Sequence, residues 1–236
     1  MGVFRKDRLK QSEQVMEQYI VRLYRGLGTS LAKRLVTLKI TPNQITVAGF
    51  IFVIIASLLF ATGRNMNIIF GSWVLFFSLI LDFTDGTLAR MRNQASMFGD
   101  WLDAMMDEFR EVFVVVGLCA GLYRQVPSLS VWLLGIVILS TDRMIFRTMN
   151  KLYKLIPSEE INTKVHKTFS DGAVFRIIKE FLSVRLFKYT FLVVFAIFNR
   201  IYAYMVFIAG YGVLLCLVFL AYSALRIRKK ERNLTA

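Results

Sequence analysis

Four aspartates with helical spacing lie in a largely apolar part of the chain. Asp82 and Asp85 are three residues apart, and Asp103 and Asp107 are four apart, so each pair falls on one face of a predicted helix. An aspartate at the centre of a bilayer costs about 2.5 to 3.5 kcal/mol. We therefore expect the four carboxylates to face one another, a polar cavity or a metal ion rather than lipid.

The short linker between the two pairs, residues 91–98, predicts that the helices on either side of it are antiparallel neighbours. Their carboxylates would then converge and repel one another unless cations neutralise them. Hard oxygen ligands suit Mg²⁺ or Mn²⁺ better than zinc or copper, and two such ions can neutralise the oxygens of a pyrophosphate. Asp82, Asp85, Asp103 and Asp107 are thus the candidate ligands of two metal ions. Asp107 is also the candidate base that takes the proton of an attacking alcohol.

Small residues accompany the aspartates on the same helix faces. Gly86 and Ala89 follow the first pair, and Gly99 precedes the second pair by one helical turn. Small side chains let a bulky ligand or a second backbone approach closely. Ordinary helix packing explains each of these residues, taken alone, equally well.

The elements that position these residues are predicted to be membrane-spanning helices. The chain has 236 residues, of which 56% are hydrophobic, so an integral membrane protein is expected rather than a soluble domain. The predicted fold is all-α and polytopic. A span needs about 20 apolar residues, and six segments qualify: Ile45 to Thr62, Ile68 to about Leu88, Gly99 to Tyr123, Val131 to Met149, Leu186 to Phe198, and Ala203 to Leu225.

An amphipathic helix is predicted before the first span. From about Val15 to Leu38, apolar and basic residues alternate with helical spacing, which is typical of a helix in the membrane interface. The "ITPNQIT" segment then ends it, because Pro42 disfavours α geometry in Thr41, and Thr41 or Asn43 can cap the next helix. We expect an interfacial segment at 1–40, one transmembrane domain at 41–228 and a basic cytosolic tail at 229–236.

The net charge of +14 predicts an orientation rather than a nucleic-acid partner. Most lysines and arginines lie before Thr41, between Lys151 and Lys188, or in the tail after Leu225. The positive-inside rule then places both termini and the aspartates on the cytoplasmic side, where basic residues can face anionic lipid headgroups. The single histidine and the two cysteines within apolar segments argue against a Ser-His-Asp triad, a zinc site and a disulfide framework.

The aspartates and their neighbours form a pattern that resembles a known family. Asp82-x-x-Asp85-Gly86-x-x-Ala89-Arg90, followed after eight residues by Gly99-x-x-x-Asp103-x-x-x-Asp107, matches all eight fixed positions of the CDP-alcohol phosphotransferase signature. The six-span architecture, the interfacial helix and the "TPNQIT" entry are also similar to that family. The resemblance covers most of the chain.

The resemblance implies that an alcohol hydroxyl attacks the phosphorus of a CDP-linked donor and that CMP leaves. It also implies that Asp82, Asp85 and Asp103 hold the metal ions, while Asp107 completes the site and serves as the base. The residues that it places near the CDP moiety are Gly86, Ala89, Arg90, Gly99, Asn43, Thr46 and Ser96. Arg90, near the membrane surface, is alternatively explained by contact with lipid headgroups. The resemblance further implies a homodimer.

The acceptor is less strongly indicated than the donor. Arg143 and Arg147 lie four residues apart, and Arg185 and Lys188 open the fifth predicted span, so these residues are candidates to bind an acceptor or donor phosphate. Positive-inside anchoring explains them equally well. The segment 182–199 is mildly similar to family members that use inositol phosphate. After the fourth span the sequence lacks the Lys-Ala-Arg-Ala-type run found in many members that make phosphatidylglycerol phosphate or phosphatidylinositol phosphate.

The expected donor is CDP-diacylglycerol or its ether-lipid counterpart, since a site within a membrane suits a lipid. A soluble CDP-alcohol donor remains an alternative.

A membrane prenyltransferase would place its aspartate motifs on distant helices. A cation transporter would continue its polar residues across the membrane, but the outer halves of the predicted spans are almost purely apolar. A non-catalytic scaffold would gain nothing from four buried carboxylates.

Overall fold

The computed structural model describes residues 21–155 and 186–235, and these residues form helices joined by short connections. The chain divides into two compact units. One comprises Met1–Pro127 and Ser183–Ile201, and the other comprises Ser128–Leu182 and Tyr202–Ala236. The four aspartates belong to the first unit.

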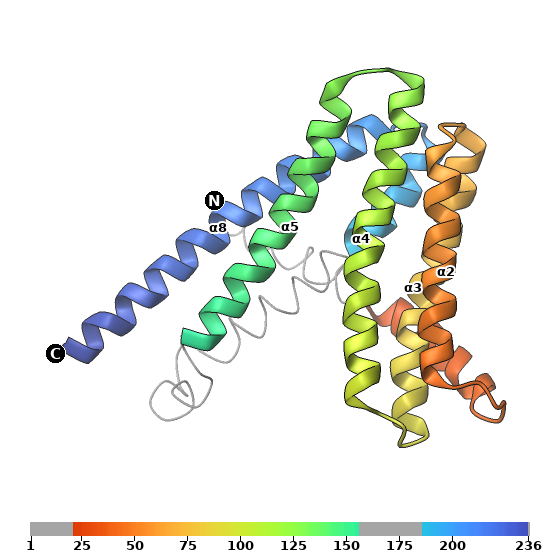
Figure 1. Ribbon diagram of the computed structural model, residues 1–236, viewed down its shortest axis with the longest axis horizontal. Helices are drawn as coiled ribbons and strands as arrows, with labels where there is room; N and C mark the ends of the chain where they lie inside the picture. The colour runs from red at the N-terminus through yellow and green to blue at the C-terminus, as the bar shows by residue number, and fades with distance from the viewer. Residues whose placement is uncertain (1–20, 156–185, 236) are drawn as a thin grey trace, which may run out of the picture. The chain divides into compact units, whose positions relative to one another are not determined.

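The first unit is built around α2 (Pro42–Ala61), α3 (Asn65–Met91) and α4 (Met97–Gln125), which run side by side (Figure 1). A helix at 21–35 and the helix Leu186–Ile197 complete it. The sequence correctly predicts the start of α2. Thr41 is the N-cap, and its side chain and that of Gln44 form a reciprocal capping box, with Pro42 in the first turn.

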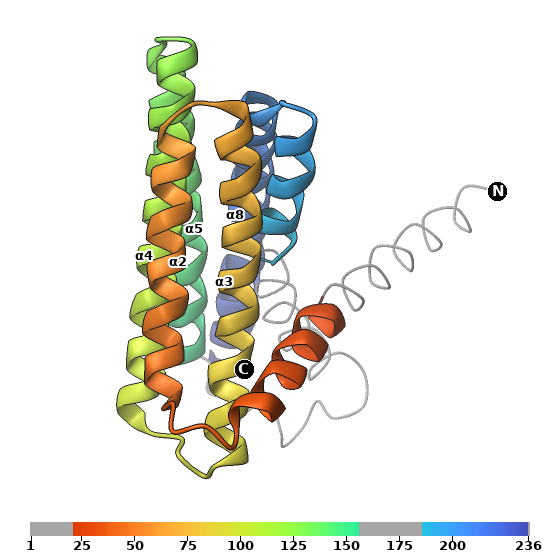
Figure 2. The same cartoon turned by 90° about the vertical axis from the view of Figure 1, so that its right-hand side faces the viewer.

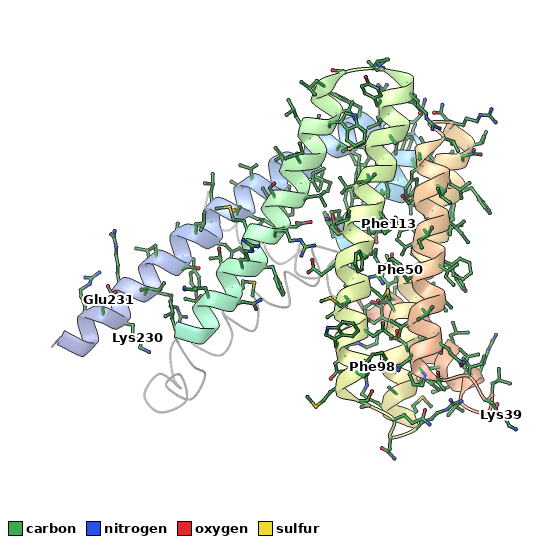
Figure 3. The ribbon with its side chains drawn as sticks, in the orientation of Figure 1. Lys39, Phe50, Phe98, Phe113, Lys230 and Glu231 are labelled. Atoms are coloured by element: carbon green, nitrogen blue, oxygen red, sulfur yellow. The ribbon has the colours of Figure 1, made fainter. Side chains whose placement is uncertain are left out.

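Small residues bring α2 and α4 into close contact. The Ser57 hydroxyl donates to the carbonyl of Phe113 at 2.6 Å. A β-carbon added to Gly121 would collide with the carbonyl oxygen of Phe60, so only glycine allows this approach of the two backbones. Further along the same interface Phe50 and Phe113 meet edge to face, with ring centroids 5.7 Å apart (Figure 3). α2 and α4 are therefore tightly packed against each other.

The helix at 21–35 docks beside α3 and is steeply inclined to it (Figure 2). Tyr24 is fully buried, stacks on Phe83 at 6.0 Å and shares a 3.1 Å hydrogen bond with Thr190.

After this helix the chain turns, and the Arg92 guanidinium donates to the carbonyls of residues 35, 36, 38 and 40 at 2.5 to 2.8 Å. A helix is thus present where the sequence predicts one. Its position in a membrane interface stays a prediction, and residues 1–20 lie outside the described part.

The second unit contains α5 (Leu129–Leu155) and α8 (Ile201–Thr235). Ile145 and Met149 of α5 form a buried cluster with Cys216 of α8. Close to the chain end, the Lys230 ammonium donates to the carbonyl of Leu155 at 3.0 Å, and Figure 3 labels Lys230 on α8. α8 continues through the basic residues that the sequence analysis assigns to a tail.

Within residues 21–155 and 186–235, four helices are long and apolar enough to cross a membrane: Pro42–Ala61, Asn65–Met91, Leu129–Leu152 and Ile201–Arg232. Many of their large apolar side chains are exposed, as expected of surfaces that face lipid. α4 has 29 residues, which is ample length at about 1.5 Å each, but its first half is rich in charged residues. Leu186–Ile197 is apolar but shorter. An all-helical membrane protein is therefore supported, while the count of six spans stays a prediction.

Candidate active site

The two helices that carry the aspartates bring their carboxylates within electrostatic range of one another. Asp82 and Asp85 lie on α3, Asp103 and Asp107 on α4. The Asp85 carboxylate interacts with those of Asp82 and Asp103, and the Asp103 carboxylate interacts with those of Asp82 and Asp107. The predicted convergence from two neighbouring helices is thus present in the structure.

Asp85 is the most enclosed of the four and is held from two sides. Only 5% of the residue is exposed. The hydroxyl of Thr46, on α2, donates to its Oδ2 at 2.6 Å, and the backbone N–H of Gly86 donates to its Oδ1 at 2.5 Å. These bonds fix the orientation of the carboxylate before any ligand arrives. Thr46, which the family resemblance places near the nucleotide, therefore has a direct contact with a predicted metal ligand.

Arg110 joins the two helices at the site. Its Nη2 donates to Asp82 Oδ1 at 2.6 Å, its Nη1 donates to Asp107 Oδ1, and its side chain is only 8% exposed. Arg110 is not among the site residues predicted from the sequence. The available signal was its position three residues after Asp107, which places the two on one helix face.

Asp103 carries a buried oxygen that the protein does not satisfy. Among the described residues, its Oδ1 has no hydrogen-bond partner. Leaving a buried acceptor unpaired costs about 1 to 3 kcal/mol, and more for a charged group. A cation held at this oxygen would remove that cost.

The side chains fit a hard divalent cation in their chemistry. All four are carboxylates, and one of them has an unsatisfied buried oxygen. Within the described ranges, however, no three His, Cys, Asp or Glu side chains are already arranged as a metal-binding group. Arg110 instead pairs with two of the four carboxylates.

Comparison with known proteins agrees with the aspartate pattern. The model of the CDP-alcohol phosphatidyltransferase family matches residues 39–221, a range that includes all four aspartates and α2 to α5. The chain belongs to this family. The match covers most of both compact units, so the membership applies to the fold as well as to the signature.

Similar proteins include archaetidylinositol phosphate synthases and phosphatidylinositol phosphate synthases. Archaetidylinositol phosphate synthase of Pyrococcus horikoshii is 35% identical over 91 residues, 39% of this chain and 47% of that protein. Phosphatidylinositol phosphate synthase of Corynebacterium glutamicum is 37% identical over 82 residues, 34% of this chain and 36% of that protein. The matched segments thus span less than half the length of these relatives.

Solved structures share the fold. Phosphatidylinositol phosphate synthase of Mycobacterium tuberculosis with CDP-DAG bound has a TM-score of 0.58 and 21% sequence identity, and the match covers 83% of this chain and 92% of that chain. The same enzyme in complex with manganese and citrate also has a TM-score of 0.58 at 21% identity, over 83% of this chain and 88% of that chain. At this identity the likeness shows the fold alone.

Three of the residues that the family pattern places near CDP meet where α2 and α4 begin. A β-carbon added to Gly99 would lie 3.2 Å from both Asn43 Oδ1 and Ser96 Oγ. Ser96 also caps α4, since its hydroxyl accepts from the Gly99 N–H at 3.0 Å. The structure therefore gathers these three residues, and their contact with a nucleotide stays a prediction.

The remaining residues of the signature lie on the last turns of α3. Arg90 is exposed and donates to the Thr87 hydroxyl at 3.3 Å. A β-carbon on Gly86 would meet only the Arg90 guanidinium, at 3.5 Å or more, so Gly86 leaves open space beside it. Ala89 is partly buried. An open glycine beside an exposed guanidinium suits an approaching phosphate, and a role of Arg90 in binding CDP stays a prediction.

Three of the basic residues predicted to bind a further phosphate lie outside the described part of the first unit. Arg143 and Arg147 are exposed on α5, in the second unit, and Arg185 lies outside the described residues. Their role stays a prediction. Lys188, considered for the same task, is instead buried and pairs with Glu111 of α4.

Glu111 is the centre of a buried polar contact that the sequence analysis misses. Lys188 Nζ donates to its Oε1, and the Tyr189 hydroxyl donates to its Oε2 at 2.6 Å. The three residues are between 4% and 9% exposed. They fasten Leu186–Ile197 to α4 one helical turn beyond Asp107.

Proposed function

We propose that this chain transfers a substituted phosphate from a CDP-linked donor to the hydroxyl of a polar alcohol and releases CMP, as a step of phospholipid biosynthesis. The proposed donor is CDP-diacylglycerol or its ether-lipid analogue, and the proposed acceptor is a phosphorylated polyol such as inositol phosphate or glycerol phosphate. The observation that carries the proposal is the convergence of four carboxylates from two adjacent helices in a member of this family.

The relatives support the choice of substrates. The two relatives described above are named for inositol phosphate lipids, and a solved structure of the same fold contains CDP-DAG. The exposed apolar surfaces of the long helices also favour a donor that arrives from the lipid phase. Inositol phosphate is accordingly our first choice of acceptor.

In this proposal Asp82, Asp85, Asp103 and Asp107 hold Mg²⁺ or Mn²⁺, most simply as two ions. Bound there, the ions would neutralise the diphosphate of the donor and stabilise its leaving group. Thr46 and the Gly86 N–H keep Asp85 oriented. Asn43, Arg90, Ser96 and Gly99 bind the CDP moiety, with Gly86 and Ala89 leaving room for it.

The proposed base is Asp107. It takes the proton of the acceptor hydroxyl while the new oxygen–phosphorus bond forms and the bond to CMP breaks, so that CMP carries away the electron pair. We further propose that Arg143, Arg147 and Arg185 bind a phosphate of the acceptor or donor. The site and both termini would face the cytoplasm, and the protein would work as a homodimer with six spans.

Release of CMP by purified protein tests the proposal. The protein, Mg²⁺ and CDP-diacylglycerol or its ether analogue should release CMP when inositol phosphate or glycerol phosphate is added. A chelator should abolish the release, and either Mg²⁺ or Mn²⁺ should restore it. Asp107→Asn should fold and still bind the donor but lose turnover by at least about a hundredfold.

The matched control is Asp100→Asn, an exposed aspartate on the first turn of the same helix that is no part of the signature. It should retain turnover. The proposal would be abandoned if the wild-type protein releases no CMP from lipid or soluble CDP donors. Ion flux into liposomes under the same conditions would favour a cation transporter instead.

A further inference from the structure

One guanidinium occupies the middle of the carboxylate cluster. Arg110 reaches from α4 to Asp82 Oδ1 on α3 and back to Asp107 Oδ1 on its own helix. Its side chain is 8% exposed, and its Nε is buried with no hydrogen-bond partner among the described residues. A buried arginine with an unused donor is costly unless its charge is needed where it lies.

The charge is needed because the cluster is strongly acidic. Asp82 repels Asp85 and Asp103, and Asp107 repels Asp103. Arg110 pairs with two members of this cluster at once, Asp82 on α3 and Asp107 on α4. Without a counter-charge the two helices would be pushed apart where they carry these groups.

The surrounding residues keep Arg110 directed at the aspartates. Glu111 is the next residue on α4 and is the obvious competitor for the guanidinium. Its two oxygens are engaged by Lys188 and by the Tyr189 hydroxyl. The pairing of Arg110 with Asp82 and Asp107 is therefore supported by a second, separate set of contacts.

A divalent cation would bind carboxylates with which the guanidinium already pairs. Asp82 and Asp107 are both proposed metal ligands, and one oxygen of each accepts from Arg110. A guanidinium and a metal ion repel each other, so the two cations compete for the negative charge of these carboxylates. We propose that Arg110 is a resident counter-ion that a divalent cation must displace, so that this arginine sets the metal affinity of the site. The inference rests on the proposed function, because it takes Asp82 and Asp107 as metal ligands.

Binding of Mn²⁺ to purified protein, followed by electron paramagnetic resonance without any substrate, measures this role directly. Arg110→Met should bind Mn²⁺ at least about tenfold more tightly than wild type, a difference of about 1.4 kcal/mol. Arg110→Lys keeps the charge but cannot donate to both aspartates in the same way. Its Mn²⁺ affinity should therefore lie between that of wild type and that of Arg110→Met. Arg124→Met, an exposed arginine at the far end of α4, is the matched control and should bind Mn²⁺ as wild type does.

Thermal unfolding separates this role from a merely structural one. Arg110→Met should unfold at a lower temperature than wild type without metal, and saturating Mn²⁺ should remove most of the difference. An arginine needed only for packing would leave the same deficit with and without Mn²⁺, which would overturn the inference. Should Arg110→Met fail to fold, the Arg110→Lys variant decides the question, since unchanged or weaker Mn²⁺ binding in it contradicts displacement.

Failure of the inference differs from failure of the proposed function. A wild-type protein that binds Mn²⁺ and releases CMP, with equal or weaker Mn²⁺ binding in Arg110→Met, would overturn the counter-ion role alone. A wild-type protein that neither binds Mn²⁺ nor releases CMP would overturn both.

Discussion

Replacement of Lys188 by methionine should destabilise the protein strongly, because Lys188 neutralises a carboxylate inside the first unit. Lys188 is 5% exposed and its partner Glu111 is 9% exposed. Two unit charges about 3 Å apart attract by about 5 kcal/mol at an effective dielectric constant of about 20. Removing one partner of a buried pair costs about 3 to 5 kcal/mol. We therefore expect Lys188→Met to lower the free energy of unfolding by that amount.

The double variant Lys188→Met/Glu111→Gln should be more stable than Lys188→Met alone, since it leaves no unpaired charge. Tyr189→Phe should cost about 1.5 to 3 kcal/mol, the value of a hydrogen bond to a charged group. Reversible unfolding in mixed micelles provides the free energies, with Lys33→Met, an exposed lysine of the 21–35 helix, as control. Our account of the pair is wrong if Lys188→Met costs less than about 1 kcal/mol. It is also wrong if the cost of the double variant equals the sum of the costs of Lys188→Met and Glu111→Gln made singly.

Three further changes test other contacts. Thr46→Val removes the 2.6 Å bond to Asp85 and should weaken metal-dependent CMP release by at least about tenfold, measured against Mn²⁺ concentration. Gly121→Leu should lower stability by at least about 2 kcal/mol in thermal unfolding, because α2 leaves no room for the side chain. The control Gly210→Leu should be nearly neutral, because a β-carbon added to Gly210 has nothing within 4 Å. Arg92→Met should speed protease cleavage between residues 35 and 41, and unchanged cleavage would contradict its role in holding that segment.

The sequence predicts the positions of the helices but shortens several of them. The predicted second span, Ile68 to about Leu88, corresponds to Asn65–Met91, and the third, Gly99 to Tyr123, corresponds to Met97–Gln125. Hydropathy marks only the apolar stretch, whereas backbone hydrogen bonding continues into the polar residues at each end. The same reason explains why α8 extends through the basic residues to Thr235.

The carboxylate cluster was predictable because its spacing is local. Positions three and four residues apart must share a helix face, and a short linker must return the chain beside itself. The pairing of Glu111 with Lys188 was not predictable in this way. The two residues are 77 positions apart, so only the docking of Leu186–Ile197 on α4 makes them neighbours. Lys188, judged by its local surroundings alone, looked like a phosphate ligand or a headgroup anchor.

The Arg92 guanidinium has a consequence for how the chain can vary. It binds backbone carbonyls between residues 35 and 40, and a carbonyl is present whatever side chain the residue bears. Replacements in that segment should therefore be tolerated as far as this contact is concerned. The constraint on residue type falls instead on position 92. An arginine there has five N–H donors, and the three donors of a lysine cannot reproduce them.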